Sequence, residues 1–224
     1  MYHRAVIPTV VVERAEVPGG ELVLSRRGDE WSIRVRRVEL MNSRNHGSED
    51  ELGRMTCARI GTRAAPRLLV GGLGLGFTLR ATLDALAASA RVDVVEIVPA
   101  IVRWNRDLFG ALAAHPLADP RVTVVEADVG HVIRGAKAGT YDAILLDVDN
   151  GPDGVYDGNA GLYKRAGLVA AHAALAPGGI LAVWSSFESK TFTQWLRDVG
   201  FAVDLQGVRA AGARHYIWFA KRAA

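Results

Sequence analysis

Short apolar runs alternate with amphipathic helical stretches over residues 67–199, and this alternation constrains the fold more than any other feature of the sequence. Runs such as Leu68–Val70 and Ile144–Leu146 have the length of buried strands, and residues with helical spacing follow them. Repeated strand–helix steps of this kind build a mostly parallel sheet covered by helices. The sequence therefore predicts an α/β fold, a three-layer sandwich around a mostly parallel seven-stranded sheet.

The last two strands of this sheet are expected to be antiparallel. Only Arg209–Arg214 separates the apolar segments 201–208 and 215–220, and a parallel crossover needs a dozen or more residues. The other expected strands are 67–72, 92–97, 122–126, 141–148 and 180–185. The expected helices are 76–88, 100–113, 129–135, 161–175 and 191–199.

Residues 1–60 have a different pattern and are expected to form a small β-hairpin region with a linking helix, ahead of an α/β domain at 61–224. Segments 21–25 and 31–35 flank a turn, and the second alternates apolar with polar residues. Ser48 and Glu51 have the spacing of a helix capping box. A hairpin alone is marginally stable, so its apolar face needs the main domain or another copy of the chain. A homodimer is therefore expected.

Composition and charge exclude several classes of protein. The net charge is +3 and the basic residues are scattered, which argues against a nucleic-acid partner. Cys57 is the single cysteine, so neither an internal disulfide nor a multi-cysteine zinc site can form, and no metal is expected. Charges recur throughout, so no membrane span is expected, and the N-terminus lacks a signal-peptide pattern. A cytoplasmic location is the expectation.

A glycine cluster follows the first strand of the large domain. Gly72, Gly74 and Gly76 lie at a strand-to-helix turn, where glycine lets the backbone approach a ligand closely. Close packing of the helix on the strand is an alternative reason for the same residues. The dinucleotide pattern G-x-G-x-x-G is incomplete because Phe77 and Leu79 stand where its third glycine would fall. An adenosine without a pyrophosphate is therefore favoured.

Three acids stand at the ends of the following strands. Glu96, Asp128 and Asp147 close the second, third and fourth strands, and ligands of open α/β sheets bind at these carboxyl ends. An acid about twenty residues after the glycines can accept hydrogen bonds from ribose hydroxyls. Each acid alone is commonly a solvated or helix-capping residue, but their shared position predicts a nucleotide pocket.

Five segments together resemble the spermidine synthase family. They are VGGLGLGFTLRATL, VVEIVPAIVRWN, VEADV, YDAILLDVDNGP and LYKRAGLVAAHAALAPGGILAVWS, and the likeness covers roughly residues 67–186. The resemblance implies a class I S-adenosylmethionine-dependent methyltransferase-like fold and transfer of an aminopropyl group from decarboxylated S-adenosylmethionine to a small-molecule amine. It also implies that Glu96 holds the ribose, Asp128 the adenine amine, and that Asp147 is the general base.

The sequence departs from the family pattern at the side arm of the donor and at the polyamine site. Leu75 replaces the aspartate of the family's glycine motif, Asn150 replaces its later acid, and residues 51–60 contain no tyrosine. Two alternatives therefore stay open: a small-molecule methyltransferase that uses intact S-adenosylmethionine, and a non-catalytic nucleotide-binding homologue. A carboxylate on the donor would tolerate Leu75, whereas the acids from Asp147 to Asp157 would attract a polyamine.

The expected site combines these hypotheses. Asp149, Asn150 and Trp184 are expected to line the acceptor site, the last because it ends the fifth strand. The expected nucleotide-binding residues are Gly72, Gly74, Gly76, Glu96, Ile97, Asp128, Val129 and Asp147.

Overall fold

The computed structural model describes residues 7–17, 20–148, 152 and 160–224. It contains two compact units, residues 1–46 and residues 47–224, called here the first and second units. The helix that the sequence analysis grouped with the N-terminal region, α1 (Gly47–Ile60), lies in the second unit. Among the described residues, no helix is long and apolar enough to cross a membrane.

The first unit is a small antiparallel sheet of four strands in the order β1-β2-β3-β4. Its strands are β1 (Val10–Val17), β2 (Gly20–Arg27), β3 (Glu30–Val35) and β4 (Val38–Asn42). The expected hairpin is β2 with β3, and the structure adds a strand on each side of it. Leu22, Leu24 and Ile33 are buried on one face, as the alternation in the sequence predicts.

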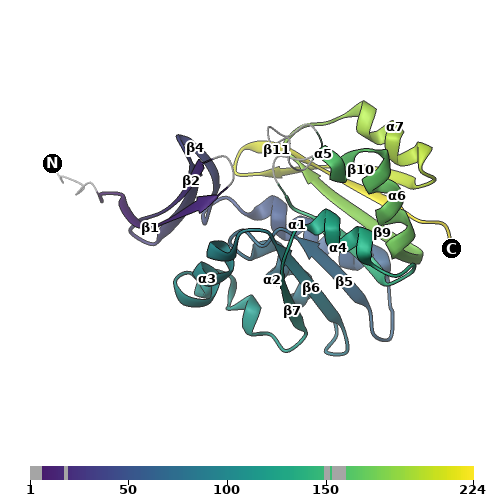
Figure 1. The fold of residues 1–224 in the computed structure, drawn as a ribbon, viewed down its shortest axis with the longest axis horizontal. Helices are drawn as coiled ribbons and strands as arrows, with labels where there is room; N and C mark the ends of the chain where they lie inside the picture. Colours follow the sequence, from purple (N-terminus) through teal and green to yellow (C-terminus); the bar gives the residue numbers. More distant parts are fainter. Residues whose placement is uncertain (1–6, 18–19, 149–151, 153–159) are drawn as a thin grey trace. The chain divides into compact units, whose positions relative to one another are not determined.

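The second unit contains the predicted seven-stranded sheet in the order β10-β11-β9-β8-β5-β6-β7 (Figure 1). The first five strands of this sheet along the chain are parallel, and β11 is antiparallel both to β9 and to its other neighbour, β10. The strands are β5 (Arg67–Gly71), β6 (Arg91–Glu96), β7 (Val122–Glu126), β8 (Tyr141–Leu146), β9 (Leu175–Ser185), β10 (Ala202–Ala210) and β11 (Ala213–Lys221).

Helices connect the parallel strands, as expected. They are α2 (Phe77–Asp84), α3 (Pro99–Asp107), α4 (Val129–Gly135), α5 (Ala160–Tyr163), α6 (Arg165–Ala174) and α7 (Lys190–Asp198). Three predicted helices differ from the structure. The one expected at 76–88 forms only over Phe77–Asp84. The one expected at 100–113 ends at Asp107, and a 3-10 turn (Gly110–Ala113) follows it, with Gly110 packed against the backbone of Asn105. The one expected at 161–175 is divided at Lys164 into α5 and α6.

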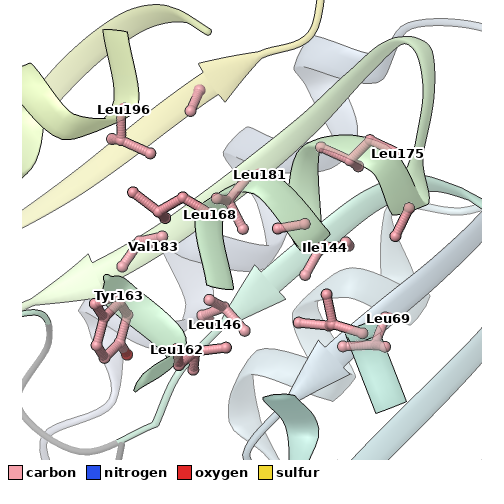
Figure 2. Packing of buried hydrophobic residues seen from close by; sticks show 14 of the residues in the cluster. Leu69, Ile144, Leu146, Leu162, Tyr163, Leu168, Leu175, Leu181, Val183 and Leu196 are labelled. Carbon is pink, nitrogen blue, oxygen red and sulfur yellow. The ribbon is translucent and has the colours of Figure 1, made fainter. Parts of the chain in front are cut away.

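A continuous apolar core fixes the strands on one face of the sheet. Figure 2 shows strand residues Leu69, Ile144 and Val183 facing Leu162 and Leu168 from the helices α5 and α6. Residues from α4 and α7 complete the same cluster. Because this core is buried and close-packed, the strand ends that emerge from it form a rigid edge on which a site can be built.

On the other face, α1 packs against α2, β8 and β9. Contact between the two helices is close at Gly53, where a Cβ atom would lie 2.8 Å from the Thr82 amide nitrogen. The predicted capping box is absent. Ser48 lies inside the helix and its hydroxyl donates to Glu49, while Glu51 pairs with Arg54.

Candidate functional site at the carboxyl ends of the strands

The ends of four parallel strands remain joined by backbone hydrogen bonds beyond the sheet itself. The Gly72 amide donates to the Val95 carbonyl at 2.9 Å, and the Asp147 amide donates to the Gly71 carbonyl at 2.9 Å. On the far side, Ala127 donates to the Glu96 carbonyl at 3.0 Å. These bonds hold the ends of β5, β6, β7 and β8 side by side, at the edge where open α/β sheets bind their ligands.

The glycine turn between β5 and α2 has backbone angles that favour glycine. Gly72, Gly74 and Gly76 have φ of 87°, 50° and 89°. A Cβ atom at Gly72 would lie 2.2 Å from the Asp147 carbonyl oxygen, and one at Gly76 would lie 3.0 Å from Pro116. Packing within the protein therefore accounts for two of these glycines, which was the alternative raised by the sequence. The same packing brings Asp147 against the turn.

Asn105 on α3 holds the glycine turn by a side-chain hydrogen bond. Its side-chain Nδ2 donates to the Gly74 carbonyl at 2.8 Å and to the Ile101 carbonyl at 3.0 Å. The residue is only 2% exposed, and its Oδ1 has no hydrogen-bond partner among the described residues. An amide at this position was not selected from the sequence, where it is one polar residue on an amphipathic helix.

Glu96 lies directly beside the glycine turn. It is 6% exposed, and its two carboxylate oxygens accept hydrogen bonds from the amides of Leu73, at 3.0 Å, and Val98, at 2.9 Å. Burial raises the pKa of Glu96, and these backbone bonds oppose the rise. The backbone amides of Gly74 and Ile97 also lower this pKa, so the glycine turn and the end of β6 hold the carboxylate in place.

Asp147 lies at the end of β8, on the opposite side of the glycine turn. Its Oδ2 accepts a 2.5 Å hydrogen bond from the hydroxyl of Thr78, in the first turn of α2. Burial, followed by the negative charge of Glu49, raises the pKa of Asp147 to about 7, although the Thr78 bond opposes the rise. An acid that titrates near neutral pH is suited to exchange protons with a substrate.

Glu49 is a second acid at this position and comes from α1. Its backbone carbonyl lies 3.5 Å from the Thr78 hydroxyl, and its Oε2 accepts a 2.6 Å hydrogen bond from Ser48. Neither Glu49 nor Thr78 was selected from the sequence. Their only sequence signals were an ordinary helix start and a helix residue after the glycines, and neither signal shows which strand end the side chain approaches.

Comparisons with known proteins find sequence similarity over about half of the chain. The sequence is 38% identical over 114 residues to putrescine N-methyltransferase 3 of Nicotiana tabacum, covering 51% of this chain and 28% of that protein. It is 34% identical over 119 residues to polyamine aminopropyltransferase 2 of Streptomyces coelicolor, covering 52% and 21% of the two chains. No family model matches the sequence.

The fold comparison covers nearly the whole chain. The spermidine synthase of Thermotoga maritima superposes with a TM-score of 0.73 and 16% identity, covering 95% of this chain and 73% of that one. The chain has the fold of the spermidine synthases. The matched segment spans under a third of the two curated relatives, at 28% and 21% of their length.

Leu75, within the glycine turn, is part of the core. Leu75 is 4% exposed. The glycine turn therefore offers no charged side chain from this position to an ammonium group of a donor.

The remaining nucleotide-binding candidates differ in their surroundings. Asp128 caps α4, accepts a 2.7 Å hydrogen bond from the His131 amide, and is partly exposed. Val129 is buried, and a Cβ atom at Gly71 would lie 2.7 Å from its Cγ2. Ile97, next to Glu96, is 63% exposed and leaves an apolar surface at the end of β6.

On the acceptor side, Trp184 lies near the end of β9 and stacks on His215 of β11, with ring centroids 5.2 Å apart. The buried Trp184 Nε1 and His215 Nδ1 have no hydrogen-bond partner among the described residues. The two other expected acceptor residues, Asp149 and Asn150, lie outside the described residues.

Proposed function

We propose that this chain provides the catalytic core of a transferase that moves an aminopropyl group from decarboxylated S-adenosylmethionine to a small-molecule amine. The observation that carries the proposal is Asp147, an acid with a pKa raised to about 7 that lies against the glycine turn at the carboxyl edge of the sheet. The polyamine aminopropyltransferase and spermidine synthase relatives supply the reaction class.

The nucleotide half of the site is the better defined one. Glu96 lies at the end of β6 beside the glycine turn, where a carboxylate can accept from ribose hydroxyls, and Ile97 offers an apolar surface beside it. In the proposal Asp128 accepts a hydrogen bond from the adenine amine, and Val129 packs against Gly71 at the end of β5. The donor is a co-substrate, and its sulfonium activates the neighbouring carbon toward attack.

The proton step assigns a role to Asp147. A protonated amine has no lone pair, so it must lose a proton before its nitrogen can attack. In our proposal an oxygen of Asp147 takes that proton, the nitrogen lone pair forms the new C–N bond, and the C–S bond breaks with its electron pair leaving on sulfur. A side chain that accepts a proton in this way typically contributes a factor of roughly 10² to 10⁴ in rate.

Methyl transfer from intact S-adenosylmethionine to the same class of acceptor is the second candidate. The buried Leu75 supports it, because the glycine turn offers no acid to bind the ammonium of an aminopropyl arm. The putrescine N-methyltransferase relatives support it as well. The atoms balance as in the first reaction, with the methyl carbon in place of the aminopropyl carbon.

Trp184 is proposed to line the acceptor pocket together with Asp149 and Asn150. Its stacking on His215 fixes the indole, and two unpartnered ring nitrogens at this strand end are a polar feature that a bound acceptor or water can satisfy. An aromatic side chain in an acceptor pocket suits a small amine, because a cation is attracted to the face of an aromatic ring.

A homodimer through the first unit also belongs to the proposal. Apolar side chains are exposed on both edge strands of its sheet, including Val10 and Val12 on β1 and Val38 and Leu40 on β4. An exposed apolar edge strand favours association with another chain. Equilibrium sedimentation of the wild type and of Val10→Lys/Val12→Lys tests this, and a monomeric wild type contradicts it.

Cys57 is free and buried, which fits the cytoplasmic location that we propose.

The deciding experiment compares the two donors. Calorimetry measures the affinity of the protein for S-adenosylmethionine and for its decarboxylated form, and mass spectrometry then follows putrescine incubated with each. Tighter binding of the decarboxylated donor and appearance of the aminopropylated product are expected. A methylated product instead establishes the second candidate. Tight binding with no product from either donor, over a panel of small amines, identifies a non-catalytic homologue.

A further inference from the structure

The first turn of α1 is held against the end of β8 by a helix contact that requires glycine. A Cβ atom at Gly53 would lie 2.8 Å from the Thr82 amide nitrogen, and 2.9 Å from both the Ala81 side chain and the Thr78 carbonyl oxygen. The two helix backbones therefore approach as closely as the chain allows. Because an α-helix is stiff, this contact determines where residues one turn earlier, including Glu49, are placed.

Thr78 stands between the two acids and contacts both of their residues. Its hydroxyl donates to Asp147 Oδ2 at 2.5 Å and lies 3.5 Å from the Glu49 carbonyl oxygen. The Glu49 carboxylate is oriented by the buried Ser48, whose hydroxyl donates to Oε2 at 2.6 Å. The hydroxyls of Thr78 and Ser48 therefore each have a defined carboxylate acceptor.

We propose that Glu49 is a positioning residue for the transfer reaction, acting through Asp147 to keep that carboxyl able to take up the proton of the amine acceptor near neutral pH. The inference rests on the proposed function, in which Asp147 receives that proton. An aspartate with its ordinary proton affinity would be a weak base, and a neighbouring negative charge strengthens it.

The charges around Asp147 are few among the described residues. From α1 the acting charge is Glu49, which after burial is the second cause of the raised pKa of Asp147. Helix α2 presents the neutral hydroxyl of Thr78, and β5 with its turn presents the backbone of Gly71 and Gly72. No cation among the described residues acts on Asp147 as a cause of its pKa shift.

The test is a carboxyl titration that does not depend on turnover. Carbon-13 NMR of the protein labelled at aspartate carboxyls follows each carboxyl signal as the pH is changed. The signal of Asp147 is identified because it is missing in Asp147→Asn, and its shift with pH gives the titration midpoint. In Glu49→Gln this midpoint is expected to fall by on the order of one pH unit, because a like charge has been removed. Glu49→Asp retains the charge, and the midpoint is expected to stay raised.

Glu51→Gln is the matched control. Glu51 also lies in the first turns of α1, and its replacement removes the same charge. Its carboxylate pairs with the exposed Arg54 rather than with the site. In Glu51→Gln the titration midpoint of the Asp147 carboxyl is expected to equal the wild-type value. An equal midpoint in Glu49→Gln and wild type overturns the inference, as does an equal fall in both glutamine variants. Thermal unfolding of each variant checks that the folds are comparable.

Kinetics separate this inference from the proposed function. If wild type converts putrescine with either donor, the acidic limb of the kcat/KM profile is expected to move to lower pH in Glu49→Gln and to stay in place in Glu51→Gln. If wild type turns over neither donor while the NMR midpoint falls in Glu49→Gln, the proposed function fails and the electrostatic part of the inference holds. A shifted midpoint with an unmoved acidic limb overturns the link to the reaction.

Discussion

Thr78 donates a 2.5 Å hydrogen bond to Asp147 and thereby joins the first turn of α2 to the end of β8. These residues are 69 positions apart in sequence. The glycine turn and the strand end that carries the acid are thus one structural unit. Any change in the turn is transmitted to the carboxylate through this bond and through the close approach of Gly72 to the Asp147 backbone.

Replacing Thr78 with valine removes the hydroxyl and keeps the shape. The Thr78 bond lowers the pKa of Asp147, so its loss is expected to raise that pKa further above about 7. The acidic limb of the kcat/KM profile therefore moves to higher pH, opposite to the change expected for Glu49→Gln. Thr78→Ser keeps the donor and serves as control. A Thr78→Val profile that overlies the wild-type profile would show that the bond has no influence on the reaction.

The raised pKa of Asp147 also predicts how stability depends on pH. Between the ordinary value of 3.8 and about 7, the folded state binds this proton more strongly than the unfolded state. The free energy of unfolding contributed by this group therefore falls as pH rises through that window. Asp147→Asn is expected to remove the contribution. Urea denaturation of this variant should therefore show a smaller decrease in the free energy of unfolding between pH 5 and pH 8 than in wild type.

The same variant is expected to lower turnover by a factor of roughly 10² to 10⁴.

The alternation of strands and helices and the antiparallel last pair could be read from the sequence because both follow from local patterns. Apolar runs such as Ile144–Leu146 identify strands, and the six residues from Arg209 to Arg214 decide that the last pair is antiparallel. The strands β1 and β4 were not predicted. In β1, Val10–Val12 is exposed throughout, and the half-buried face that follows begins with the charged Glu13, so apolar residues do not mark its inner face. In β4 the first three residues are all exposed.

The partners of Asp147 could not be read in the same way. Thr78 and Glu49 lie on two helices whose contact depends on Gly53, and a glycine inside a helix does not show which helix it faces. The buried amide of Asn105 is similar, since its role depends on the carbonyl of Gly74. The strand end of an acid follows from the order of elements, whereas its neighbours follow from packing between elements that are distant in sequence.

Glu96 provides a test of the nucleotide half of the site. Glu96→Gln keeps an acceptor oxygen but removes the charge, and it sets an amide NH2 against one of the two backbone donors. Affinity for the adenosyl donor, measured by calorimetry, is expected to fall by roughly 10- to 150-fold, because hydrogen bonds to a charged group contribute about 1.5–3 kcal/mol. Glu126→Gln is the matched control, since Glu126 is exposed and is the register partner of Glu96 on β7. Equal losses in both variants would argue that general surface charge, and not the Glu96 carboxylate, determines binding.

Gly53 provides the test of the helix contact on which the site depends. In Gly53→Ala the new methyl would lie 2.8 Å from the Thr82 amide nitrogen, and this neighbour is backbone that cannot turn away, so α1 must move from α2. Overpacking of this kind costs about 1–3 kcal/mol, measured as the free energy of unfolding in urea. Gly135→Ala is the control, because nothing lies within 4 Å of a Cβ atom there, and that change is expected to be neutral or stabilising by up to about 1 kcal/mol.

Since moving α1 carries Glu49 away from Asp147, the Asp147 carboxyl is expected to titrate at lower pH in Gly53→Ala and to be unchanged in Gly135→Ala. A destabilised Gly53→Ala whose Asp147 still titrates as in wild type would separate the helix contact from the electrostatics of the site.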